Sequence, residues 1–151
     1  RHVFGDATGS LSAAVDRLGH QWARTGQRAV NGSPLSAGLF PGELHMVFGR
    51  PDQGRVREVV DEIETAIAEL AAAAPTVPDG EVTVRELTQA ARLARHGAWR
   101  LLGGAGPGGE AMAADMAELI EGQTVTWLDR SRPGGLSDSL ARLDPSITEH
   151  T

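Results

Sequence analysis

Apolar residues recur at helical spacing along most of the chain. Leu11, Val15, Leu18 and Trp22 lie at i, i+4, i+7 and i+11, which predicts a helix over residues 10–24. A longer stripe predicts a second helix over 53–74: Val56, Val59, Ile63, Ile67, Leu70 and Ala74. A third stripe predicts a helix that ends near 102: Leu87, Ala91, Ala94, Ala98 and Leu101. A fourth stripe predicts a helix that begins near 109: Met112, Met116, Leu119, Gln123 and Trp127.

Capping residues set the expected ends of these helices. Asp52 is expected to cap the second helix and Pro75 to end it. Thr83 and Glu86 have the spacing of a capping box, which predicts that the third helix begins at Thr83 and ends before Gly103. The first helix has three candidate caps and one stop: Asp6, Thr8, Ser10 and Gly26.

The remaining segments are short. Turn residues 31–34 are followed by an expected helical turn over 35–40, and residues 43–50 fit either a short helix or a buried extended segment. A last short helix is expected over 137–143, and no run alternates like a strand. The fold class is therefore all-α: one domain over 1–151, a helical bundle of about four long helices plus short terminal helices. The tryptophans, all on predicted helices, are expected to fill the core: Trp22, Trp99 and Trp127.

Net charge, cysteine content and the length of apolar runs argue against several classes of function. The net charge of −6 argues against nucleic acid as a partner, because phosphate binding needs a dense basic surface. The absence of cysteine excludes thiol catalysis and cysteine zinc sites, and no apolar run reaches the roughly 18–20 residues that span a bilayer. No membrane partner is expected. The chain begins at Arg1 without Met, so we expect a fragment of a longer protein, and its compartment stays open.

No catalytic, cofactor or metal site is expected. No two of the five histidines have the i, i+3 or i+4 spacing of paired ligands on one helix. Gly104, Gly106 and Gly109 match G-x-G-x-x-G, but a helix is expected before them where a dinucleotide site needs a strand, so we interpret them as a linker. Asp61 and Glu62 point about 100° apart on a helix and belong to a solvated face.

The third and fourth long helices carry stripes of opposite charge. The basic stripe is Arg85, Arg92, His96 and Arg100, and the acidic one is Asp115, Glu118, Gly122 and Asp129. Pairing across an antiparallel helix hairpin explains them, and docking against another domain is the alternative. We favour pairing within the hairpin.

Two stretches resemble a known family. Residues 125–139, VTWLDRSRPGGLSDS, resemble the pattern W-L-x-R-N-R-P-G-G-L-x-D-S found near the C-terminus of bacterial glycoside hydrolase family 20 proteins, the β-N-acetylhexosaminidase family. Ser131 stands where the pattern has Asn. Residues 3–11, followed by 31–35, are similar to the segment after the catalytic barrel of those proteins.

The resemblance implies an accessory role. In that family a (β/α)8 barrel performs the chemistry with an adjacent Asp-Glu pair, and nothing in this sequence predicts such a barrel. The implied function is a non-catalytic C-terminal domain of a β-N-acetylhexosaminidase-like enzyme. Its partner would be the catalytic barrel of its own parent chain, or a second copy in a homo-oligomer. The alternative is a stand-alone helical interaction domain unrelated to sugars, and an independent enzyme is the least favoured hypothesis.

The resembling segment also has a physical interpretation. Pro133 cannot continue a helix, and Gly134-Gly135 allows a sharp reversal that folds a last helix, capped by Ser137 or Asp138, back on the bundle. On this interpretation Gly134→Val destabilises the domain. The candidate residues for this corner, or for docking, are Trp127, Arg130, Arg132, Pro133, Gly134, Gly135 and Asp138.

Overall fold

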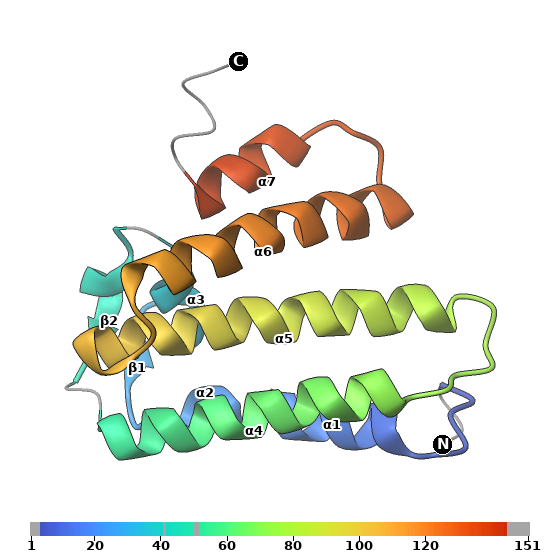
Figure 1. Ribbon diagram of the computed structural model, residues 1–151, viewed down its shortest axis with the longest axis horizontal. Helices are drawn as coiled ribbons and strands as arrows, with labels where there is room; N and C mark the ends of the chain where they lie inside the picture. Colours follow the sequence, from blue (N-terminus) through green and yellow to red (C-terminus); the bar gives the residue numbers. More distant parts are fainter. Residues whose placement is uncertain (1–3, 41, 50–51, 145–151) are drawn as a thin grey trace.

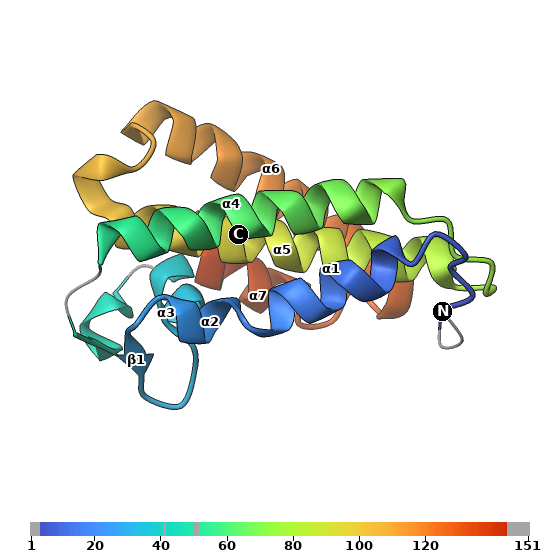
Figure 2. The ribbon, with the colours of Figure 1, turned by 90° about the horizontal axis from the view of Figure 1, so that it is seen from below.

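The all-α prediction is confirmed. The computed structural model describes residues 4–40, 42–49 and 52–144, and within them α4, α5, α6 and α7 form successive layers (Figure 1). Seen from below, α1 runs alongside α4 (Figure 2). The helices are α1 (Ser10–Gly19), α2 (Gln21–Arg24), α3 (Pro34–Leu39), α4 (Gln53–Ala72), α5 (Gly80–Leu102), α6 (Gly109–Arg130) and α7 (Leu136–Leu143), with 3-10 turns η1 (Leu44–Met46) and η2 (Gly103–Ala105).

The core lies where α4 meets α1 and α5. The Asp52 carboxylate caps α4, as predicted, and accepts hydrogen bonds from the backbone N–H groups of Gly54 (2.9 Å) and Arg55 (3.2 Å). The predicted stripe is largely correct, although Ala74 lies beyond the helix and is exposed. The residues that α4 buries are Val56, Val59, Ile63, Ala66 and Leu70.

The first predicted helix is two helices, with a break at His20. The Gln21 side chain donates from Nε2 to the carbonyl oxygen of Arg17 (2.7 Å), while the backbone N–H of His20 approaches the same oxygen at 3.5 Å. A side chain thus competes with the backbone for this carbonyl, and the helix is interrupted. Burial also differs from the prediction, because Ala14 is buried where Val15 was expected and Val15 is 37% exposed.

The predicted capping box is wrong. Helix α5 begins at Gly80, three residues before Thr83. The Thr83 hydroxyl donates to the carbonyl oxygen of Asp79 (3.0 Å), and the Glu86 carboxylate binds Arg130 instead of reaching back to a cap. Both side chains that fit the capping pattern therefore have other partners.

Residues 43–49 contain a short 3-10 helix, as one of the two expectations had it, followed by an extended segment, and residue 50 lies outside the described residues. The turn η1 is followed by β2 (Val47–Phe48), which pairs antiparallel with β1 (Arg28–Ala29). This short sheet was not predicted, and its Phe48 is 58% exposed, so the extended part is not buried.

Helix α3 crosses α5 at close range. Ser33 caps α3 by accepting a hydrogen bond from the backbone N–H of Ser36 (3.1 Å). At the crossing, Gly38 faces Gly97, and a Cβ atom added at Gly97 would lie 2.0 Å from the carbonyl oxygen of Leu35. The two backbones can approach this closely because neither glycine has a side chain. No helix of the described chain has the length and apolar character that crossing a membrane requires.

Candidate functional site

The segment that resembles family 20 proteins forms a tight corner between α6 and α7. The Trp127 indole donates from Nε1 to the carbonyl oxygen of Arg132 (2.9 Å), across the turn. Gly135 has φ +83°, and a Cβ atom at this position would lie 3.5 Å from the Trp127 ring. The Leu136 N–H then binds the Pro133 carbonyl oxygen (3.1 Å) as α7 begins. The expected corner is therefore present, and Trp127 holds it.

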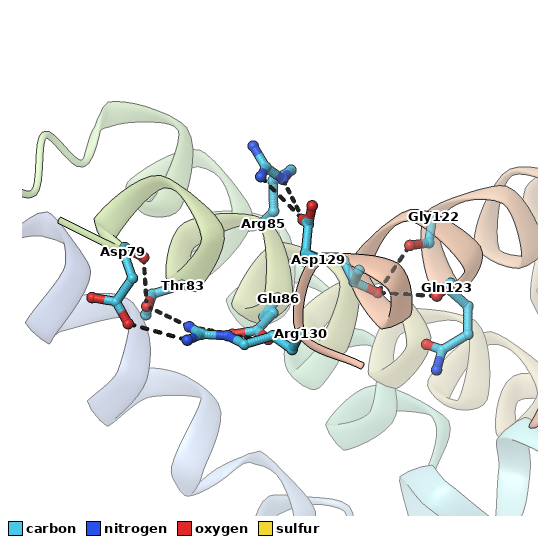
Figure 3. Close-up of polar contacts among 9 residues, drawn as sticks. Asp79, Thr83, Arg85, Glu86, Gly122, Gln123, Asp129 and Arg130 are labelled. Atoms are coloured by element: carbon cyan, nitrogen blue, oxygen red, sulfur yellow. Dashed lines mark hydrogen bonds and ion pairs between the residues drawn. The ribbon is translucent and has the colours of Figure 1, made fainter. Parts of the chain in front are cut away.

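Arg130 ties the end of α6 to the start of α5. Its guanidinium donates from Nε to Glu86 (2.9 Å), from Nη1 to Asp79 (3.1 Å) and from Nη2 to the Thr83 hydroxyl (3.4 Å), as Figure 3 shows. The hydrogen bonds that Arg130 donates to Glu86, and then the one it donates to Asp79, raise the pKa of Arg130 above its ordinary value. Arg130 thus remains a cation, and its donors are directed at residues of this chain.

The charged stripes pair across the α5–α6 hairpin as predicted. Arg85 binds Asp129 at 3.0 Å (Figure 3), and Arg92 binds Glu118 at 2.5 Å. In each of these pairs one side chain is largely exposed, Arg85 at 47% and Glu118 at 69%, and such pairs are worth only about 0–1 kcal/mol each.

The most enclosed contact of the hairpin surrounds Asp115. This carboxylate accepts from His96 Nδ1 at 2.8 Å and from Arg95 at 2.6 Å, and the side chains of His96 and Asp115 are 3% and 9% exposed. Two other members of the predicted stripes make different contacts. Arg100 donates to the carbonyl oxygen of Leu39 on α3, and Gly122 faces the amide of Gln89.

Two predicted details of the corner are wrong. Helix α7 begins at Leu136 after Gly135, and neither Ser137 nor Asp138 caps it; Asp138 is exposed in its first turn. Gly134 has open space around the position of a Cβ atom and lacks a positive φ, so the constrained glycine is Gly135.

The corner does not gather all the candidate residues into one pocket. The Trp127 ring lies next to the position that a Cβ atom at Gly135 would occupy, whereas Arg130 faces α5. The others lie exposed on the outside of the turn: Arg132, Pro133, Gly134 and Asp138. The geometry therefore fits a structural corner better than a pocket for a ligand.

The other motifs considered in the sequence, the glycine-rich segment and the Asp61-Glu62 pair, do not form a site together. The Gly104 and Gly106 segment follows helix α5 directly through η2, as a helix–helix linker does. Asp61 is exposed, whereas Glu62 faces α1 and binds Arg17 and Arg24. Among the residues that the structure describes, no three His, Asp or Glu side chains are placed to hold a metal ion.

The sequence did not predict an apolar groove that residues of α1 to α5 line, among them Leu35, Leu87 and Ala94. Trp22 was expected to fill the core, but it is 52% exposed and lines this groove together with Leu18. Helical spacing identifies their shared face but does not reveal which neighbour covers it. No single-sequence signal distinguishes such a face from a covered one.

Comparisons with known proteins identify no relative. No family model matches the sequence, and neither curated proteins nor solved structures give a match.

Proposed function

We propose that residues 1–151 are a non-catalytic accessory domain of a β-N-acetylhexosaminidase-like glycoside hydrolase of family 20, and that the domain packs on the catalytic barrel of its parent chain. The resemblance of residues 125–139 and 3–11 to that family motivates the choice of enzyme. The resembling residues with defined contacts, Trp127, Arg130 and Gly135, hold the helices of this chain together. This internal role supports an accessory domain rather than a sugar-binding site.

The exposed apolar side chains of α6 are the observation that supports packing on the barrel. Leu119 is the one buried residue of this 22-residue helix. Val125 and Leu128 are 47% and 48% exposed and lie three residues apart on the helix, where Val125 also borders a shallow hollow shared with α5. Exposed Ala114 and Ala117 lie on the same side of the helix, with the exposed Glu121 between the two pairs. Large apolar side chains that stay exposed on a helix fit a surface that another domain covers.

The coding sequence upstream of Arg1 gives the first test. We expect it to encode an alternating βα barrel with an adjacent Asp-Glu pair at the end of a strand. A start codon near Arg1, or an unrelated upstream domain, would contradict the proposal and favour the stand-alone interaction domain.

The packing itself is tested by Val125→Glu in the parent protein and in the isolated domain. Because the side chain is exposed in the domain alone, we expect no change in its melting temperature there. In the parent the charge would enter the interface, and we expect a loss of about 2–4 °C or more. Val15→Glu on α1, another exposed valine, is the matched control. Equal melting temperatures for the two parent variants would reject α6 as the docking face.

A further inference from the structure

Glu121 is an exposed carboxylate in the middle of the exposed apolar side chains of α6. Four of these lie within about 40° of Glu121 around the helix, and we call the five residues together the α6 patch: Ala114, Ala117, Glu121, Val125 and Leu128. Buried Leu119 lies about 160° from Glu121 around the same helix. The α6 patch is therefore on the side of α6 opposite its buried residue.

Glu121 has no charged partner within the domain. Three other acidic side chains of α6 pair with arginines of α5: Asp115 with Arg95, Glu118 with Arg92, and Asp129 with Arg85. Among the described residues, Glu121 takes part in no ion pair. The residues three and four positions away from it on α6 carry no positive charge either, so the helix supplies no partner of its own.

A surface that covers the α6 patch must therefore supply a positive charge. Burying a carboxylate is strongly unfavourable unless a cation and hydrogen-bond donors replace its water. A second copy of this chain does not meet this need. In a two-fold symmetric pair, a residue at the centre of the patch meets the same residue of the other copy, so two Glu121 carboxylates would repel each other.

The α6 patch also lies close to the point where a preceding domain would be joined. The carbonyl oxygen of Gly5 accepts a hydrogen bond from the Thr76 hydroxyl (3.0 Å), and Arg130 at the end of α6 binds Asp79 (3.1 Å), three residues further along the same segment. Both views of the ribbon place the end of α6 and the first described residues at the same end of the bundle (Figures 1 and 2). A barrel that precedes this domain would thus be connected on the side of Leu128.

We propose that the catalytic barrel of the parent chain covers the α6 patch with a basic side chain that pairs with Glu121, and with apolar residues around it that contact Val125 and Leu128. This inference rests on the proposed function and adds the chemistry of the opposing surface. Arginine suits the position best, because its guanidinium binds a carboxylate through two parallel hydrogen bonds.

Glu121→Gln in the parent protein is the first test, because glutamine keeps the shape of the side chain and removes its charge. The basic partner would then be buried without a counter-charge, so we expect the melting temperature of the parent to fall by about 4 °C or more. Residues 1–151 alone should be unaffected. Glu58→Gln on α4 is the matched control, since Glu58 is also exposed and has no ion pair among the described residues. Equal melting temperatures for the two parent variants would overturn the proposal.

Comparison with Val125→Glu separates this inference from the proposed function. If Val125→Glu lowers the melting temperature of the parent and Glu121→Gln does not, the barrel docks on α6 without a basic partner, and only this inference is wrong. If neither substitution has an effect, both the docking face and the opposing base are wrong.

Charge reversal identifies the partner. We expect Glu121→Arg to destabilise the parent protein, and replacement of one arginine or lysine on the barrel by glutamate to restore its melting temperature. Failure of every such replacement to restore it would overturn the proposal.

Sedimentation of residues 1–151 over a range of concentrations tests the alternative occupant. We expect a monomer. A dimer that Val125→Glu abolishes would make a second copy the occupant of the α6 patch and would also overturn the proposal.

Discussion

Single residues determine how the chain turns from α6 into α7. Gly134 and Gly135 are adjacent and look equivalent in the sequence, but only Gly135 adopts a positive φ, of +83°. L-residues with a side chain rarely adopt this conformation, and a β-branched side chain is strained there. The backbone thus gives the two glycines different roles.

Gly135→Val is expected to destabilise the domain by about 1–3 kcal/mol, because valine is strained at this φ. Its Cβ atom would also lie against the Trp127 ring at 3.5 Å. Gly134→Val is the control and should change the free energy of unfolding by less than about 1 kcal/mol, since nothing surrounds that position. Urea unfolding of both variants measures the difference, and a larger loss at Gly134 would restore the expectation drawn from the sequence.

Asp6 makes the stability of the N-terminal segment dependent on pH. Its carboxylate accepts a hydrogen bond from the Thr8 hydroxyl (2.6 Å) and another from the Leu11 backbone N–H (2.8 Å), which lower its pKa to about 2. An unfolded aspartate has a pKa of about 3.9, so at intermediate pH the unfolded chain binds more protons. The stabilisation from Asp6 is therefore complete above about pH 4 and lost as the pH falls towards 2.

Asp6→Asn removes this titration. We expect the variant to be less stable than the wild type at pH 5, and the difference to shrink as the pH falls from about 4 to about 2. Urea unfolding at successive pH values measures it. A difference that stays constant over this range would show that the Asp6 carboxylate does not titrate as the contacts imply.

At the scale of elements, a helix end could be predicted where its cap bonds to residues a few positions away. Contacts between residues far apart in the sequence could not be predicted. Asp52 bonds to residues two and three positions away, so its cap could be recognised in the sequence. Glu86 satisfied the capping pattern equally well, but its partner Arg130 lies 44 residues away. The corner was foreseen from Pro133 to Gly135, whereas the groove was not, because it depends on where α1 and α5 lie relative to each other.

The α5–α6 interface concentrates its electrostatic stabilisation at Asp115. Asp115→Ala would leave nearly buried His96 without its carboxylate and remove one of the two ion pairs of Arg95, so we expect a loss of about 3 kcal/mol. Glu118→Ala is the control, because Glu118 is 69% exposed and such pairs contribute about 0–1 kcal/mol. Chemical denaturation compares the two, and similar losses would mean that burial does not distinguish these pairs.

At the scale of the molecule, apolar burial is uneven. Helices α4 and α5 contain most of the connected core, including Val59, Ile63, Leu70, Ala91 and Ala98. By contrast, α6 buries only Leu119 and relies on ion pairs to α5, and a glycine-rich segment joins the two helices. Helix α6 is thus held to α5 largely by polar contacts and α7 buries only Leu143, whereas the α4–α5 layer is held by apolar packing.

This asymmetry predicts that α6 and α7 open before the rest of the domain. Segments with few buried apolar contacts undergo local unfolding at a lower free energy than the core, so amide hydrogens of α6 and α7 should exchange at least about tenfold faster than those in the middle of α4 and α5. Added salt distinguishes the contribution of ion pairs from that of apolar packing. At about 1 M salt the Debye length is only about 3 Å, so exposed ion pairs are screened. Added salt should therefore accelerate exchange in α6 more than in α4. Uniform protection across the four helices, with no effect of salt, would mean that Leu119 and its half-buried neighbours suffice to join the layers into one cooperative unit.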